Sequence, residues 1–326
     1  MAQVSVPGQH AGAATASASL NAGRASLRLQ ARRVFLRAEP YLYVLPALLC
    51  IVIWVYRPLV GTLELSAYQW NLLPTTPRVP VGFENYRRVL TLPEMGQALW
   101  NTGVYIVGLL PFSVVLPLGI ALLVQGITGR MRGIYRAIIF TPMLIAPVVV
   151  AIVWRWLLHP QHGLLNAGLA DLFGTASFNW FRSQELAVWA IVGITGWKLL
   201  GFSILLFSAG LTNVSQDYLD AANVDGASSW QVARYITLPL LSPTVTFVVL
   251  LTILLSGQWT FPMISVLTQG GPLGSTASIY YLLWELGFRS FNVGLSSASA
   301  VLFFAAFGAL AWFFTKLMDR FSFYDA

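Results

Sequence analysis

The chain has 326 residues, of which 57% are hydrophobic and only 10% are Asp, Glu, Lys or Arg, and its formal charge is +7. A water-soluble domain carries roughly 25% charged residues, so this chain has too few charges to cover a globule of its size. The composition therefore excludes a soluble protein, a disordered chain and a nucleic-acid-binding protein. The single cysteine, Cys50, allows no intramolecular disulfide and no cysteine-ligated metal site.

Apolar stretches long enough to cross a bilayer recur along the chain. About 20 apolar residues are needed for a membrane-spanning helix, and six segments qualify: 41–63, 98–124, 137–158, 186–211, 241–266 and 292–318. The sequence thus predicts an all-α, polytopic membrane protein with a six-helix domain at 41–318. We expect a tail with a basic amphipathic segment at 1–40 and a short tail at 319–326.

Lysine and arginine positions predict the orientation, because cytoplasmic loops carry an excess of these residues. If the N-terminus is inside, the inner segments hold eleven: Arg24, Arg28, Arg32, Arg33, Arg37, Arg130, Arg132, Arg136, Arg234, Lys316 and Arg320. The outer loops hold five: Arg78, Arg87, Arg88, Arg182 and Arg289. Both termini are therefore expected in the cytoplasm, in agreement with an even number of spans.

One inner connection, residues 212–240, is long and polar but lacks the composition of a flexible linker. Ser215 or Gln216 is expected to begin a short helix, and Gly226 can adopt the positive φ that ends it. Ser228 or Ser229 can cap a second helix, which is expected to stop at Pro239. The segment predicts a rigid elbow beneath the membrane, or simply an ordered connection between two spans.

The spacing of small and acidic residues in this loop carries a resemblance. It is similar to the cytoplasmic-loop motif of permease subunits from ATP-binding-cassette (ABC) importers, above all those for carbohydrates. The matching residues are Asp220, Ala221, Ala222, Asp225, Gly226, Ala227, Ile236, Leu238 and Pro239. Asp220 stands where the family has glutamate, and Ala233 stands where it has an aromatic residue, with Trp230 nearby. Residues 81–86 and 267–272 resemble two outer-loop motifs of the same family.

The resemblance implies a type I ABC importer permease fold in the bacterial inner membrane. It implies that Asp220, Ala221, Ala222, Asp225, Gly226, Ala227, Trp230, Leu238 and Pro239 dock on a cytoplasmic ATPase. The expected partners are a second homologous permease subunit, two copies of the ATPase, an extracytoplasmic solute-binding protein and membrane lipid, with no nucleic acid.

Catalytic motifs are missing from the chain. No phosphate-binding G-x-x-x-x-G-K-[ST] sequence occurs, so ATP and Mg²⁺ are expected on the partner ATPase subunits, with no cofactor bound by this chain. We expect no enzymatic activity of its own. His159 and His162 could suggest a metal site, but a polar role at the membrane boundary is favoured, and no metal is expected.

Polar residues inside the fourth and fifth spans are candidates for the substrate path, because polar groups within a membrane span often have a functional role. The candidates are Thr195, Lys198, Phe202, Thr252, Ser256, Gln258 and Trp259. Lys198 could instead pair with Trp197 or hold the partner subunit. Pro262 and Gly257 are expected to break the helix around this polar cluster, and Arg155 is expected to extend outward from the third span.

The expected function is uptake of a di- or oligosaccharide. Glycerol-3-phosphate or a glycerophosphodiester is the alternative within the same machinery. An ion-coupled secondary transporter is the alternative from another class, but it would need carboxylates facing the interior of the spans. Every Asp and Glu of this chain lies in loops or at span ends.

Overall fold

The computed structural model describes residue 41 and residues 43–125, 130–174 and 177–318. The predicted tails at 1–40 and 319–326 lie outside these residues. The chain divides into two units, Met1–Gly61 and Thr62–Ala326. In the first unit, the described residues are helical from Tyr43 and include a wide π-helical turn, η1 (Val52–Tyr56).

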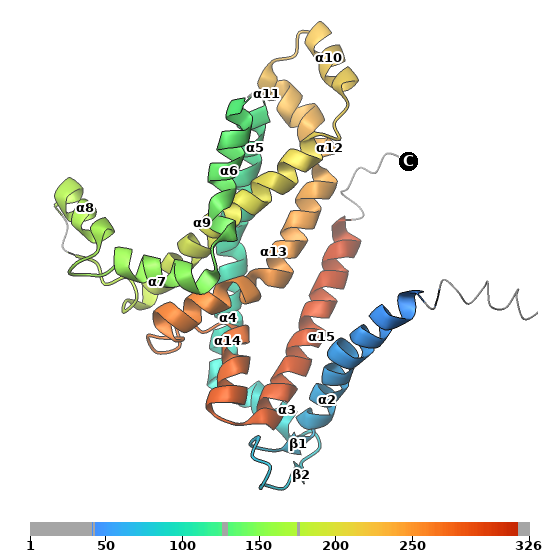
Figure 1. Ribbon diagram of the computed structural model, residues 1–326, viewed down its shortest axis with the longest axis vertical. Helices are drawn as coiled ribbons and strands as arrows, with labels where there is room; N and C mark the ends of the chain where they lie inside the picture. The colour runs from blue at the N-terminus through green and yellow to red at the C-terminus, as the bar shows by residue number, and fades with distance from the viewer. Residues whose placement is uncertain (1–40, 42, 126–129, 175–176, 319–326) are drawn as a thin grey trace, which may run out of the picture. The chain divides into compact units, whose positions relative to one another are not determined.

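Helices make up almost all of the second unit, whose α-helices and strands are labelled in Figure 1. In chain order they are α2 (Arg57–Ser66, which begins in the first unit), β1 (Tyr68–Gln69), β2 (Val79–Pro80), α3 (Glu84–Thr91), α4 (Pro93–Leu110), η2 (Pro111–Val115), α5 (Leu116–Gln125), α6 (Arg130–Leu144), α7 (Pro147–Leu157), α8 (Leu164–Phe173) and α9 (Gln184–Leu211). They continue with α10 (Gln216–Val224), α11 (Ser229–Val232), η3 (Ala233–Thr237), α12 (Leu238–Leu240), α13 (Ser242–Met263), η4 (Ile264–Thr268), α14 (Ile279–Trp284), η5 (Glu285–Arg289) and α15 (Val293–Met318).

Five helices in the described residues are long and apolar enough to cross a membrane: Tyr43–Ser66, Pro93–Val124, Gln184–Leu211, Ser242–Thr268 and Val293–Lys316. They correspond to five of the six predicted spans, with ends shifted by a few residues. The mainly α-helical class is confirmed, apart from the two-residue antiparallel pairing of β1 with β2.

The third predicted span, 137–158, is not one straight helix. It is divided between α6 and α7, whose axes differ by 93°. Ala146, between the two helices, has an extended conformation with ψ 134°, because the residue before a proline is disfavoured in the helical region. Pro147 then begins α7, where its missing N–H costs nothing. The described residues therefore hold five long spans, or six if the bent pair of α6 and α7 is counted as one span.

Helix α9 lies at the centre of the second unit and contacts α4, α5, α6 and α13 (Figure 1). Its side chains are buried along most of its length. Close approach to α6 depends on Gly201, where a Cβ atom would lie 2.3 Å from the carbonyl oxygen of Ile139. Small residues allow helix backbones to approach in this way within membranes.

Substitution of Gly201 by alanine is therefore expected to destabilise the protein by about 1–3 kcal/mol, because the new methyl group would collide with backbone that cannot rotate away. Gly193→Ala on the same helix is the matched control, since a Cβ there has no neighbour within 4 Å. Thermal unfolding of both variants in detergent checks the difference, and equal unfolding midpoints would contradict it.

The first outer-loop motif ties together segments at one end of the unit. The side chain of Asn85 is buried and donates hydrogen bonds to the carbonyl oxygens of Ser66 (2.8 Å) and Tyr68 (2.9 Å). The hydroxyls of Ser66 and Tyr86 are 2.6 Å apart. The motif at 81–86 thus holds α3 against the end of α2 and against β1.

Candidate functional site

The loop predicted to be an elbow begins with α10, capped by Ser215, whose hydroxyl accepts a hydrogen bond from the Asp217 N–H (3.3 Å). At the other end the N–H groups of Gly226 and Ala227 donate to the carbonyls of Asn223 and Ala222 at 3.1 and 3.0 Å. These two bonds form a Schellman motif, which requires a left-handed residue. Gly226 supplies it, with φ +74°, so the predicted helix end is confirmed.

The second half of the elbow begins with a capping box. The Gln231 side chain accepts from the Ser228 N–H at 2.7 Å, and the Ser228 hydroxyl accepts from the Gln231 N–H at 3.4 Å. The helical run passes through η3 and α12 and ends at Leu240, one residue past the expected stop at Pro239. The wide turn of η3 carries the chain past the proline, whose ring would otherwise clash with the carbonyl four residues earlier.

The elbow presents apolar side chains to its surroundings. Val224 is 88% exposed, Tyr235 70% and Trp230 69%. Of the predicted coupling residues, Asp220, Ala221, Asp225 and Gly226 are exposed, Ala227, Leu238 and Pro239 are half-buried, and Ala222 is buried. Val224 and Tyr235 were not among the predicted coupling residues, although apolar residues in a polar loop are a usable signal. In Figure 1 the elbow lies beyond the end of α13.

Lys198 lies at the break between α6 and α7. Its ammonium donates hydrogen bonds to the carbonyl oxygens of Met143 (2.8 Å) and Pro142 (3.4 Å). In an unbroken helix the Met143 carbonyl would accept from the N–H of residue 147, but Pro147 has none. Lys198 therefore satisfies a carbonyl that the proline leaves without a partner, at a helix C-terminus where a cation is favoured.

Lys198 also borders a cavity of about 340 Å³ between α9, α13 and the break in the third span. The cavity is lined by Met143, Pro147, Thr195, Lys198, Leu199, Gln258, Trp259, Phe261 and Pro262. It brings together four of the predicted substrate-path residues. Among the described residues, the buried Thr195 hydroxyl has no hydrogen-bond partner.

The other three predicted substrate-path residues do not line this cavity. Thr252 is buried and donates to the hydroxyl of Ser113 on η2 (2.9 Å) or to the carbonyl of Val248 (2.8 Å). The Ser256 hydroxyl donates to the Ile253 carbonyl at 3.3 Å within its own helix. Phe202 is half-buried on α9. Thr252 and Ser256 thus have packing partners inside the bundle.

The expected helix break at Pro262 is wrong, since α13 passes the proline and η4 continues it without a gap to Thr268. Pro262 has no N–H to donate to the Gln258 carbonyl. The Thr260 hydroxyl donates to other carbonyls of the helix, those of Ser256 at 2.9 Å or Gly257 at 3.3 Å. Gly257 is explained by packing, because a Cβ there would lie 2.3 Å from the ring of Tyr280.

The second outer-loop motif forms a turn that follows η4 and is tied to α4. Thr276 is central to it: its hydroxyl donates to the Gly271 carbonyl (2.8 Å), and its own carbonyl accepts from the Tyr105 hydroxyl (2.8 Å). Asn101 donates to the carbonyls of Gly274 and Ala277, both at 2.9 Å. The exposed Leu273 lies at the tip of this ordered turn.

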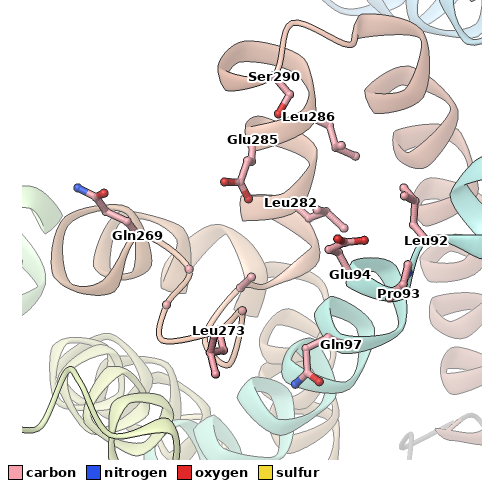
Figure 2. A pocket seen from close by; sticks show the side chains of 14 residues that line it. Leu92, Pro93, Glu94, Gln97, Gln269, Leu273, Leu282, Glu285, Leu286 and Ser290 are labelled. Atoms are coloured by element: carbon pink, nitrogen blue, oxygen red, sulfur yellow. The ribbon is translucent and has the colours of Figure 1, made fainter.

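A cavity of about 700 Å³ lies on one side of the turn. Figure 2 shows two carboxylates bordering it from different elements, Glu94 on α4 and Glu285 on η5. Glu285 also pairs with Arg289 at 3.2 Å. Burial raises the pKa of the nearby Tyr281 hydroxyl above its ordinary value.

These features describe a polytopic helical membrane protein with an ordered elbow between two of its spans. The family of binding-protein-dependent transport system inner membrane components matches residues 104–322. The chain belongs to this family. It is a multi-pass protein of the inner membrane.

Individual relatives agree with this assignment. A probable ABC transporter permease protein of Brucella suis is 30% identical over 287 residues, covering 87% of this chain and 98% of that protein. The permease protein of the trehalose/maltose transport system of Thermococcus litoralis is 33% identical over 81% of this chain and 88% of its own length. An sn-glycerol-3-phosphate permease protein of Pectobacterium atrosepticum is 28% identical, with the same coverage of both chains.

Two solved structures share the fold. A chain of a bacterial ABC transporter involved in the import of the acidic polysaccharide alginate aligns with a TM-score of 0.77 and 21% identity, covering 88% of this chain and 98% of that one. A second, from the alginate transporter in complex with an alginate pentasaccharide-bound periplasmic protein, has a TM-score of 0.76 and 22% identity, with 88% and 96% coverage. The importer permease fold is therefore confirmed.

Proposed function

We propose that this chain is the transmembrane subunit of an ATP-driven importer that takes up a di- or oligosaccharide delivered by a solute-binding protein. The observation that carries the proposal is the ordered elbow, with exposed Val224, Trp230 and Tyr235, between two spans of a protein in this family. The similarity to the trehalose/maltose permease supports a sugar as substrate.

The elbow would dock in a cleft of a cytoplasmic ATPase, two copies of which bind ATP and Mg²⁺. Trp230 and its apolar neighbours would supply the buried contact, and Asp220 and Asp225 would lie at its rim, as aromatic residues dominate interface energetics. The Schellman motif and the capping box fix the elbow's shape, so a displacement of the ATPase would reach α9 and α13. ATP drives the cycle only by binding one conformation better than the other.

The cavity beside the broken span is the proposed substrate path. A sugar presents hydroxyls and an apolar ring face, and the cavity offers the unpartnered Thr195 hydroxyl, the Gln258 amide and the Trp259 ring. The ammonium of Lys198 would contact the sugar only while it also remains hydrogen-bonded to the carbonyl oxygens of α6. The helices around the path would be held in place by the packing of Phe202, Thr252 and Ser256.

The outer side would receive the binding protein. The periplasmic protein in one solved alginate transporter structure supports such a partner, and the ordered turn around Leu273 is a firm surface for it. This assignment uses the orientation with both termini in the cytoplasm, which places the elbow inside. A second homologous permease subunit would complete the path.

Glycerol-3-phosphate or a glycerophosphodiester is the second candidate substrate, favoured by the similarity to the glycerol-3-phosphate permease. An ion-coupled transporter is disfavoured, since the interiors of the five long described spans carry no Asp or Glu.

The energy source provides the test. In cells that express the complete transporter, uptake of a radiolabelled disaccharide is expected to persist with a protonophore while ATP is maintained, and to fall at least tenfold when ATP is depleted. Labelled glycerol-3-phosphate, measured in parallel, distinguishes the two substrates. Uptake that stops with the protonophore at constant ATP would refute an ATP-driven importer.

A further inference from the structure

A second cavity on the other side of the outer turn has a basic lining. Its volume is about 560 Å³, and it lies between the end of α7, the segment before α9 and the turn after η4. The lining residues are Arg155, His159, Pro160, Gln161, Asn179, Phe181, Arg182, Leu267, Thr268, Gly271 and Pro272. No Asp or Glu is among them, so the cavity combines two permanent positive charges with neutral hydrogen-bonding groups.

The walls of this cavity are held in place by a buried amide. The Asn166 side chain, 3% exposed, donates to the carbonyls of Leu158, His159 and Phe178 at 3.0 to 3.3 Å. Its oxygen accepts from the Trp180 indole at 2.9 Å. The segments that carry the two arginines are thereby fixed relative to each other without any ligand, which lowers the entropy lost on binding.

Neither guanidinium is neutralised within the described part of the chain. The ion pairs there join Arg78 to Glu64, Arg88 to Glu84 and Arg289 to Glu285. Arg155 and Arg182 are therefore free to bind an anion. Guanidinium groups match the geometry of phosphate oxygens and are the preferred donors for them.

Helix α7 indicates what surrounds the cavity. One face, with Val150 and Ala151, is buried in the core of the unit. The opposite face is apolar and about half exposed, with Val148, Val149, Ile152, Val153 and Trp156 at the spacing of one helix face. In a membrane protein such a face contacts lipid chains, and tryptophan and arginine at its end mark the headgroup level.

We propose that this cavity binds the phosphate of an anionic membrane lipid, whose acyl chains lie along the exposed face of α7. Arg155 and Arg182 bind the phosphate oxygens, and Asn179, Gln161 and Thr268 bind the remaining polar groups of the headgroup. This site is separate from the cavity beside Lys198 and does not depend on which substrate the protein carries.

Native mass spectrometry of the purified full-length chain, exchanged from detergent into mixtures of phosphatidylglycerol and phosphatidylcholine, tests the proposal. The wild type is expected to retain phosphatidylglycerol selectively. The selectivity should fall roughly tenfold for each arginine lost in Arg155→Gln and Arg182→Gln, because each removes charge-assisted hydrogen bonds. The control is Arg87→Gln with Arg88→Gln, which removes two exposed arginines that do not line the cavity.

Selectivity that is equal in the wild type and the Arg155/Arg182 variants would overturn the proposal. Displacement of the lipid by millimolar inorganic phosphate would also overturn the proposal, because it would indicate a site for soluble anions. Loss of binding-protein docking in the arginine variants, with lipid retention unchanged, would overturn it as well. If the glutamine variants do not fold, Arg155→Lys and Arg182→Lys keep the charge but lose the paired donors, and reduced selectivity is again expected.

Discussion

Replacement of Gly226 by proline is expected to abolish uptake and to reduce copurification of the ATPase subunit at least tenfold, while the permease still inserts into the membrane. Gly226 has φ +74°, and proline is restricted to about −65°. The substitution also removes the N–H that donates to the Asn223 carbonyl. The turn between α10 and α11 cannot form with proline, so the docking surface loses its shape.

Two further variants distinguish an effect of the backbone conformation at Gly226 from a general loss of folding. Gly226→Ala meets no neighbouring atom within 4 Å and should cost about 1–2 kcal/mol through its positive φ alone, giving partial loss. Gly174→Pro places the same substitution at a left-handed helix end far along the chain, after α8, and should leave ATPase copurification intact. Full uptake and copurification in both Gly226→Pro and a deletion of residues 220–226 would refute the docking role.

Replacement of Lys198 by methionine is expected to lower the unfolding free energy by about 2–3 kcal/mol, because it leaves the carbonyls of Pro142 and Met143 without a donor. Uptake should fall with stability, since the break between α6 and α7 borders the proposed substrate path. Thermal unfolding in detergent and initial uptake rates measure the two effects. Lys316→Met, at an exposed position near the end of α15, is the control.

Lys198→Arg keeps donors near the two carbonyls and should recover much of the stability. If Lys198 only contacted substrate, Lys198→Met would raise the half-saturating substrate concentration and leave the unfolding midpoint unchanged. That result would contradict the structural role. It would also indicate that Lys198 binds substrate directly.

The elbow between the fourth and fifth spans shows how much local sequence determines. A positive-φ glycine, a serine cap and a helix-terminating hydrogen-bond pattern involve residues within six positions of each other, so Gly226 and Ser228 were predictable from their neighbours. Prolines were not predictable in this way. Pro147 follows a break between two helices, whereas Pro262 lies within a helical segment that continues through η4.

The difference lies in what surrounds each proline. Lys198, more than 50 positions away along the chain, satisfies the carbonyl freed by Pro147. This contact could not be read from the chain, because it depends on how α9 packs against α6. Gly257 likewise looked like a weak point in a helix until Tyr280 was found to fill the space beside it.

The sequence by itself determined the membrane class, five of the spans, the elbow and the family resemblance, because apolar length, caps and motif spacing are local properties. Only the tertiary structure decided that the third span bends. It also placed Thr195, Lys198, Gln258 and Trp259 around one cavity and Arg155 and Arg182 around another, while Thr252 and Ser256 pack elsewhere. Those outcomes follow from contacts between residues distant in the chain, whose geometry is set by helix packing.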